Sequence, residues 1–312
     1  MQYVKNEWIK MWSQKNAWIM CGLLIVLIVF VAGMNKYYDV DSSTKEARIA
    51  ANEEMMAYPK EMLASEDITP EDEQYFKEEI AMAEYRIAND LPAANAMTFT
   101  EHMDLSLSLT IMVTGIFTVV IAAGIVSSEF GTGTIKMLLT RPVSRWKILL
   151  SKLVASILYG IVLFAAGIVV ALIIGIALFG TDSSIALSIV DGQIVQDTVK
   201  NTFIETTLYS LGSTIMTIIF AFMIGTIFGS STLAVSLSLF ILLMGSTATM
   251  FIAQYDFAKY IWFANDLSYY APGSMPMIEG LTFTFSLVVN IVYAIVFLVI
   301  TFGYFMKRDV TA

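Results

Sequence analysis

The feature that most constrains the fold is a set of five long runs that contain no charged residue. A helix that crosses a membrane needs about 20 largely apolar residues, and each run reaches that length. The runs are Asn16–Asn35, Leu105–Ser128, Leu153–Thr181, Thr206–Tyr255 and Gly280–Met306. Of the 312 residues, 57% are hydrophobic and 14% charged, as in a polytopic membrane protein.

The fourth run is too long for one span. Its 50 residues would form a helix of roughly 75 Å, more than twice a hydrocarbon core of about 30 Å. We expect a turn at Phe228–Ala234, where small polar residues surround Gly229. The sequence thus predicts an all-α protein with six spans, at 16–35, 105–128, 148–180, 206–228, 233–254 and 281–306, and a cytoplasmic turn at 229–232.

Charge predicts the orientation. With the N-terminus inside, the cytoplasmic segments 1–15, 127–152 and 307–312 hold ten Lys and Arg against three acids, and the outside holds eight against 24. The positive-inside rule therefore predicts that both termini are cytoplasmic. The acidic balance disfavours nucleic-acid binding. A cleaved signal peptide is the alternative for the first span, but the run is longer than a typical signal core.

The N-terminal residues 1–15 have a helical amphipathic pattern. Trp8, Met11 and Trp12 gather with Ile9 on one side, and lysines lie elsewhere. This pattern predicts an interfacial helix on the inner leaflet. An ordinary start of the first span, with an aromatic belt, fits equally well.

The segment 36–104 is strongly acidic, with 17 Asp and Glu against six Lys and Arg. Apolar residues recur at helical spacing, and Thr69 followed by Pro70 is typical of a helix start. We expect an extracellular helical hairpin at about 43–63 and 70–88. Its acidic faces are either simply solvated, or they attract cationic peptides or control access to an outer vestibule.

Two further external segments are expected. In 181–205, Asp191-Gly192 between alternating apolar residues predicts a short β-hairpin. The segment 255–280 is rich in aromatic residues, which indicates either an interfacial belt or short helices that line an exit. On the second interpretation Tyr269 and Tyr270 would belong to a translocation route.

Small residues recur four apart within two spans. They are Gly167, Ala171 and Gly175 in span three, and Ala221, Gly225 and Gly229 in span four. Such stripes let helices pack closely. Asn290 is the conspicuous polar residue of span six; a hydrogen bond between helices is the favoured role, and contact with a substrate the other.

The sequence offers little to an enzyme. The apolar runs hold no Asp, Glu, His, Lys or Arg, and His102 is the single histidine. The stretch "GTGTIK" does not match a phosphate-binding Walker loop. We therefore expect no catalytic residue, metal site or cofactor in this chain, and uphill transport would need energy from a partner.

One loop concentrates basic residues. In "SSEFGTGTIKMLLTRPVSRWKILLSK", Ser127–Lys152, glycines follow span two, and "IKMLLT" has an apolar face. A proline then precedes span three. The loop is either a short helix that docks into a soluble partner or a basic anchor at the lipid headgroups.

This loop resembles the signature loop of permeases of the type 2 exporter class of ABC transporters, especially the bacitracin- and lantibiotic-type resistance permeases. The resemblance extends to the amphipathic N-terminus, the six spans and the large first external loop. It implies that Glu129–Thr140 is a coupling helix held in a groove of a separate ATPase, and that Pro142, Ser144, Arg145 and Lys152 form the turn into span three. The residues assigned to coupling, in the loop 129–147, are Glu129, Phe130, Gly131, Gly133, Thr134, Ile135, Leu138, Leu139, Arg141 and Arg145.

The resemblance implies a permease that pairs with itself or a homologue and is driven by two ATPase copies, which bind ATP and Mg²⁺. It would export or remove a hydrophobic or amphipathic compound, such as an antimicrobial peptide or a lipid-linked molecule, and so support antibiotic resistance. Two other classes stay open: a membrane-embedded enzyme, and a sensor or scaffold without transport.

Overall fold

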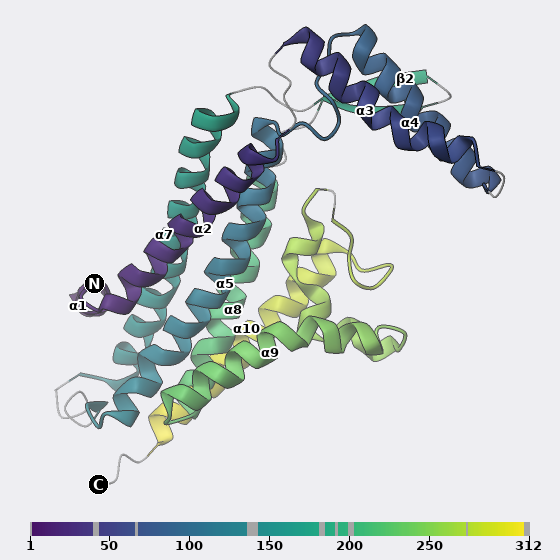
Figure 1. Ribbon diagram of the computed structural model, residues 1–312. Coiled ribbons are helices and arrows are strands. Elements are labelled where there is room, and N and C mark those ends of the chain that lie inside the picture. Colours follow the sequence, from purple (N-terminus) through teal and green to yellow (C-terminus); the bar gives the residue numbers. More distant parts are fainter. Residues whose placement is uncertain are drawn as a thin grey trace. The chain divides into compact units, whose positions relative to one another are not determined.

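The computed structural model describes residues 2–39, 44–65, 68–135, 143–180, 185–190, 193–198, 203–272 and 274–308. Within these residues, six helices are long and apolar enough to cross a membrane (Figure 1), in agreement with the predicted number. They are α2 (Lys15–Tyr37), α5 (Phe99–Gly131), α7 (Arg145–Phe179), α8 (Phe203–Ile227), α9 (Ser231–Ile252) and α10 (Phe283–Lys307). Residues 228–230, within the turn expected at Phe228–Ala234, separate α8 from α9, whereas Ser231–Ala234 already belong to α9.

The chain divides into two compact units. The first contains residues 1–27, 107–169 and 202–312, and the second contains residues 28–106 and 170–201. Helices α2, α5 and α7 contribute residues to both units, whereas α8, α9 and α10 belong to the first.

In the first unit, α5 packs closely against α7 and α8 through the predicted small residues. A Cβ atom at Gly167 of α7 would lie 2.8 Å from Oγ1 of Thr110 on α5. A Cβ atom at Gly225 of α8 would clash with the backbone of Ala123 on α5. These glycines therefore permit helix approaches that a larger side chain would prevent.

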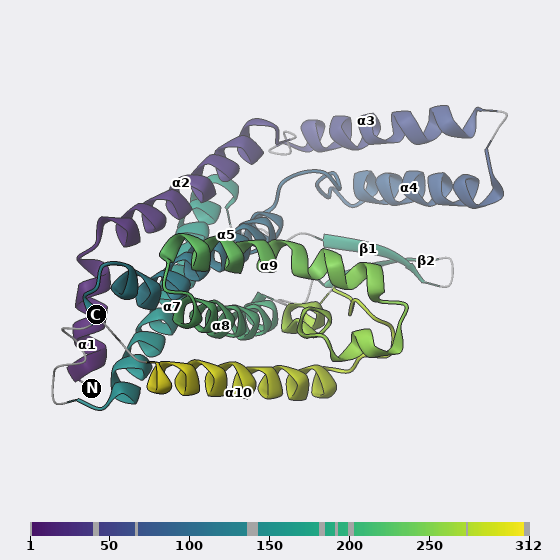
Figure 2. The same cartoon turned by 90° about the horizontal axis from the view of Figure 1, so that it is seen from below.

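Aromatic side chains join α8 to α10, which run side by side (Figure 2). The ring centroids of Phe220 and Phe297 are 5.5 Å apart, and Trp262 lies 5.1 Å from Phe220. Trp262 is only 7% exposed. The interfacial-belt interpretation is therefore wrong for Trp262, because its ring fills the core, whereas Tyr260 is 56% exposed.

The first unit also contains short helices. The N-terminal helix α1 (Gln2–Trp12) is separated from α2 by Ser13 and Gln14, so it is not simply the start of the first span. Three short 3-10 helices precede α10: η1 (Asp256–Tyr260), η2 (Trp262–Asn265) and η3 (Leu267–Tyr270).

The second unit contains two charged helices, α3 (Lys45–Leu63) and α4 (Pro70–Ala88), which lie side by side in both views (Figures 1 and 2). They match the helices predicted at 43–63 and 70–88. The hydroxyl of Thr69 accepts a hydrogen bond from the Asp72 amide at 3.2 Å, as expected of a cap.

The predicted β-hairpin also lies in the second unit. Strands β1 (Ile185–Val190) and β2 (Gln193–Thr198) pair antiparallel, with Val190 opposite Gln193. The turn residues Asp191 and Gly192 lie outside the described residues.

Candidate functional site

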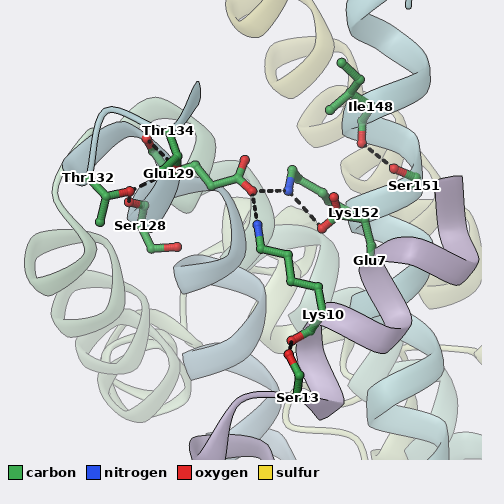
Figure 3. Close-up of polar contacts among 10 residues, drawn as sticks. All are labelled: Glu7, Lys10, Ser13, Ser128, Glu129, Thr132, Thr134, Ile148, Ser151 and Lys152. Atoms are coloured by element: carbon green, nitrogen blue, oxygen red, sulfur yellow. Dashed lines mark hydrogen bonds and ion pairs between the residues drawn. The ribbon is translucent and has the colours of Figure 1, made fainter. Parts of the chain in front are cut away.

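Four charged side chains from three helices of the first unit meet one another (Figure 3). The Lys152 Nζ atom of α7 lies 2.6 Å from Oε1 of Glu129 on α5 and 2.9 Å from Oε2 of Glu7 on α1. Lys10 of α1 approaches the same Glu129 oxygen at 2.5 Å. We call Glu7, Lys10, Glu129 and Lys152 the charge cluster.

The charge cluster is balanced and largely buried. The side chain of Lys152 is fully buried, that of Glu129 is 3% exposed and that of Glu7 11%, whereas Lys10 is 49% exposed. A buried charge is costly without a partner, so each inner charge depends on the others. Among the described residues, Oε2 of Glu129 is buried without a hydrogen-bond partner.

The local sequence explains how Glu129 reaches this position. Helix α5 continues beyond the predicted end at Ser128 and includes Glu129, Phe130 and Gly131. Glu129 is therefore in the last turn of the long helix, which ends at Gly131, and it does not begin a separate helix. Gly133, with a φ of +74°, follows as the residue that redirects the chain.

The loop residues next to α5 are tied back to it. The hydroxyl of Thr132 donates to the Ser128 carbonyl at 2.8 Å, and the Thr134 hydroxyl lies 3.0 Å from that of Thr132. Ile135 is 2% exposed and belongs to the main core. The predicted coupling residues Leu138, Leu139 and Arg141 lie outside the described residues, as does Pro142.

Arg145 and Arg308 hydrogen-bond to the carboxyl-terminal ends of α10 and α8 beside the same loop. Arg145, the first residue of α7, donates to the carbonyl oxygen of Met306 in the last turn of α10 at 3.4 Å and to that of Arg308 just after α10 at 3.1 Å. Arg308 in turn donates to the Thr226 carbonyl at the end of α8 and lies over the Phe130 ring, 4.1 Å from its centroid. Arg145 is thus bound to protein carbonyls, which a residue that only faces lipid headgroups would not be.

Two of the three residues assigned to a translocation route, Asn290 and Tyr270, belong to a polar network separate from the charge cluster. Asn290 donates to the Asn265 carbonyl at 2.6 Å and to the Ser286 carbonyl at 2.8 Å. The Ser286 hydroxyl lies 2.7 Å from that of Tyr270. Asn290 is only 6% exposed, so these contacts match the hydrogen-bonding role that the sequence favoured. Burial raises the pKa of the nearby Tyr269 phenol.

Sequence reasoning underestimated the charged residues at the helix ends. Lys152 was assigned to the turn into span three, but it lies about two turns inside α7. The sequence pattern gave Glu7 and Lys10 no role beyond the count of charged residues in segment 1–15. The available signal was one acid directly after span two and one base directly before the uncharged run of span three.

Comparison with known proteins gives the family of the chain. Residues 74–311 match the family model described as "Protein of unknown function (DUF2705)", and the chain belongs to this family. It is 37% identical over 316 residues to the uncharacterized protein YhcI of Bacillus subtilis (strain 168), with 99% of each chain covered. It is 31% identical over 227 residues to the uncharacterized membrane protein YdbK of the same organism, covering 70% of this chain and 87% of that protein.

Together these observations define a class. The chain is a multi-pass, mostly helical membrane protein, with one small β-hairpin in its second unit. Neither relative carries an activity in its name. The function is therefore inferred from the residues.

Proposed function

We propose that this chain is the transmembrane permease subunit of an ABC exporter, driven by two copies of a separate cytoplasmic ATPase. The observation that carries the proposal is the buried ion pair of Glu129 and Lys152. This pair joins α5 to α7, and the loop that resembles a coupling loop connects the same two helices. A partner can move a span through a loop only if the loop is firmly attached to that span. The pair, with Ile135 in the core, supplies such an attachment.

The helices attached to the loop are long enough to transmit a movement. Helix α5 has 33 residues and α7 has 35, or roughly 50 Å each at 1.5 Å per residue. On this account ATP binding closes the ATPases, the loops of two permease copies approach each other, and spans two and five part or close at the interface between the copies. ATP and Mg²⁺ belong to the ATPase.

A cavity in the first unit supports a route for an amphipathic compound. It has a volume of about 260 Å³. Polar residues of α1, of the link to α2 and of the start of α2 line one part of it: Lys10, Gln14 and Asn16. Apolar residues of α5 and α9, such as Ile121 and Val235, line another. A hydrophobic or amphipathic substrate, such as an antimicrobial peptide or a lipid-linked molecule, fits this lining.

The proposal includes an orientation. Both termini and the charge cluster would face the bacterial cytoplasm, and the α3–α4 pair would be extracellular, because the inner segments carry the excess of Lys and Arg. The N-terminal helix α1 would lie along the inner leaflet.

The test is reconstitution. The chain would be tagged and purified from the membranes of its own cells, and any complex recovered with it would be placed in liposomes. We expect an ATPase to be recovered and its hydrolysis of ATP to depend on the permease. A sensor or scaffold would show no stimulated hydrolysis, and recovery without any ATPase would contradict the proposal.

A further inference from the structure

Helices α3 and α4 enclose a second, smaller cavity in the second unit, with a volume of about 90 Å³. One wall is a single face of α4, where Glu79, Met82 and Arg86 recur at helical spacing. Asn52 and Met55 of α3 form the facing wall. The space equals that of about three waters in the liquid.

Asn52 points to a ligand with a donor group. Its side chain is fully buried. Its Nδ2 atom donates to the Arg48 carbonyl at 2.8 Å and to the Leu91 carbonyl at 3.4 Å, and these two bonds fix which end of the amide is the oxygen. Among the described residues, the Oδ1 atom is buried without a hydrogen-bond partner. Such an acceptor in a cavity is normally satisfied by a water or by a ligand.

The other polar groups of the cavity indicate the charge of that ligand. The Glu79 carboxylate adds a negatively charged acceptor, and it accepts a hydrogen bond from the Tyr75 hydroxyl at 3.2 Å. The Arg86 guanidinium, the one basic group in the lining, donates to the Pro92 carbonyl at 3.0 Å. The cavity therefore offers an amide oxygen and a carboxylate beside the polarizable thioethers of Met55 and Met82.

We propose that this cavity receives the primary ammonium group of a cationic ligand, such as a lysine-type side chain of a peptide. An ammonium has three donors and no acceptor, which complements Asn52 Oδ1 and the Glu79 carboxylate. It is also compact enough for the small volume, unlike a planar guanidinium. The acidic segment 36–104 would raise the local concentration of such cations.

The proposal deepens the proposed function, because it rests on the extracellular position of α3 and α4 and assigns a cationic group to the exported compound. Its test uses the full chain in phosphatidylcholine nanodiscs without any ATPase. The probe is a fluorescent peptide with one lysine, compared with the same peptide acetylated at Nε, and binding is followed by fluorescence anisotropy. We expect saturable binding that acetylation weakens about tenfold or more, since a charge-assisted contact is lost.

Two neighbouring glutamates provide a matched pair of variants. Glu79→Gln removes the carboxylate from the cavity lining and should weaken binding about tenfold. Glu78→Gln removes the same charge one residue away, where the carboxylate accepts a hydrogen bond from Gln74 at 2.9 Å and does not line the cavity. It should leave affinity within about twofold, as expected for a screened surface charge. Met82→Phe, which fills the cavity without changing charge, should abolish saturable binding.

Several results would overturn the proposal. Equal losses for Glu78→Gln and Glu79→Gln would mean diffuse attraction by the acidic surface. Full binding by the acetylated peptide would mean that the ammonium is not recognised. Full binding by Met82→Phe would mean that the peptide does not enter the cavity. The absence of saturable binding would mean that the cavity holds water alone. Because the assay contains no ATPase, these results leave the permease proposal to its own test.

Discussion

The Lys152 ammonium of α7 and the Glu129 carboxylate at the end of α5 form an ion pair 2.6 Å long that is almost entirely removed from solvent. The two residues are 23 positions apart, and the segment between them contains the loop that resembles a coupling loop. Glu7 and Lys10 of α1 complete the balance of charge. The N-terminal helix, span two and span three are therefore fixed to one another at the base of this loop.

The charge cluster predicts unequal effects for two identical substitutions. Lys152→Met leaves Glu7 and Glu129 without their buried counter-ion, and breaking a buried pair in this way costs about 3–5 kcal/mol. Lys10→Met removes a lysine that is 49% exposed, which should cost at most about 1 kcal/mol. Thermal unfolding of both variants in detergent measures the difference. Equal melting temperatures would contradict the structural role of Lys152.

Gly225 is predicted to tolerate no side chain. Gly225→Ala places a Cβ atom against the Ala123 backbone of α5, and overpacking of this kind costs about 1–3 kcal/mol. Gly303→Ala in α10 is the control, since a Cβ atom there meets nothing within 4 Å, and the change should be neutral or stabilising because alanine favours helix. Equal thermal stability of the two variants would argue against the close approach of α5 and α8.

Asn290→Leu should lower stability without preventing insertion into the membrane. The variant loses two hydrogen bonds and leaves the Asn265 carbonyl without its donor. Hydrogen bonds of this kind contribute about 0.6 kcal/mol on average and up to about 2. Thermal unfolding and transport by the complex measure the effect. Unchanged values for both would make Asn290 incidental.

Cysteine labelling tests the orientation. In a background where Cys21 is replaced by alanine, single cysteines at Ser65 and Ser188 should react with a membrane-impermeant maleimide on intact cells. A cysteine at Ser144 should react only after the cells are opened, because the charge count predicts a cytoplasmic position for the basic loop. Labelling of Ser144 on intact cells would reverse the whole topology.

The sequence predicted the elements whose signals are local. Uncharged length gave the six membrane-spanning helices, and Thr69-Pro70 gave the start of α4. The turn pair Asp191-Gly192 gave the β-hairpin. Periodicity and turn chemistry act over a few neighbouring residues, so they can be read without knowledge of the tertiary structure.

The features that could not be predicted from the sequence depend on contacts between segments that are far apart in the chain. Glu7 and Lys152 are 145 positions apart, and nothing in either neighbourhood specifies the other as a partner. Trp262 looked like an interfacial aromatic because its loop is rich in such residues, yet its ring is held by Phe220 and Phe297.

The most direct test of the central claim compares two variants of the loop and its surroundings. If the loop docks into an ATPase, the Leu138 side chain is buried in that partner, and burial of a leucine is worth about 1.5–3 kcal/mol. Leu138→Asp forfeits this and puts a carboxylate into an apolar contact, so the complex should weaken about tenfold or more. Lys147 is exposed on α7, and its ammonium lies over the neighbouring Trp146 ring, so Lys147→Gln should leave the contact between Leu138 and the ATPase unchanged.

The measurement is the amount of ATPase recovered with the tagged permease at equal membrane insertion, together with ATP hydrolysis in liposomes. The account predicts that Leu138→Asp loses most of the ATPase and of its stimulated hydrolysis, and that Lys147→Gln retains both. Normal recovery and hydrolysis for Leu138→Asp would contradict the coupling role and leave the loop as a basic anchor at the membrane surface.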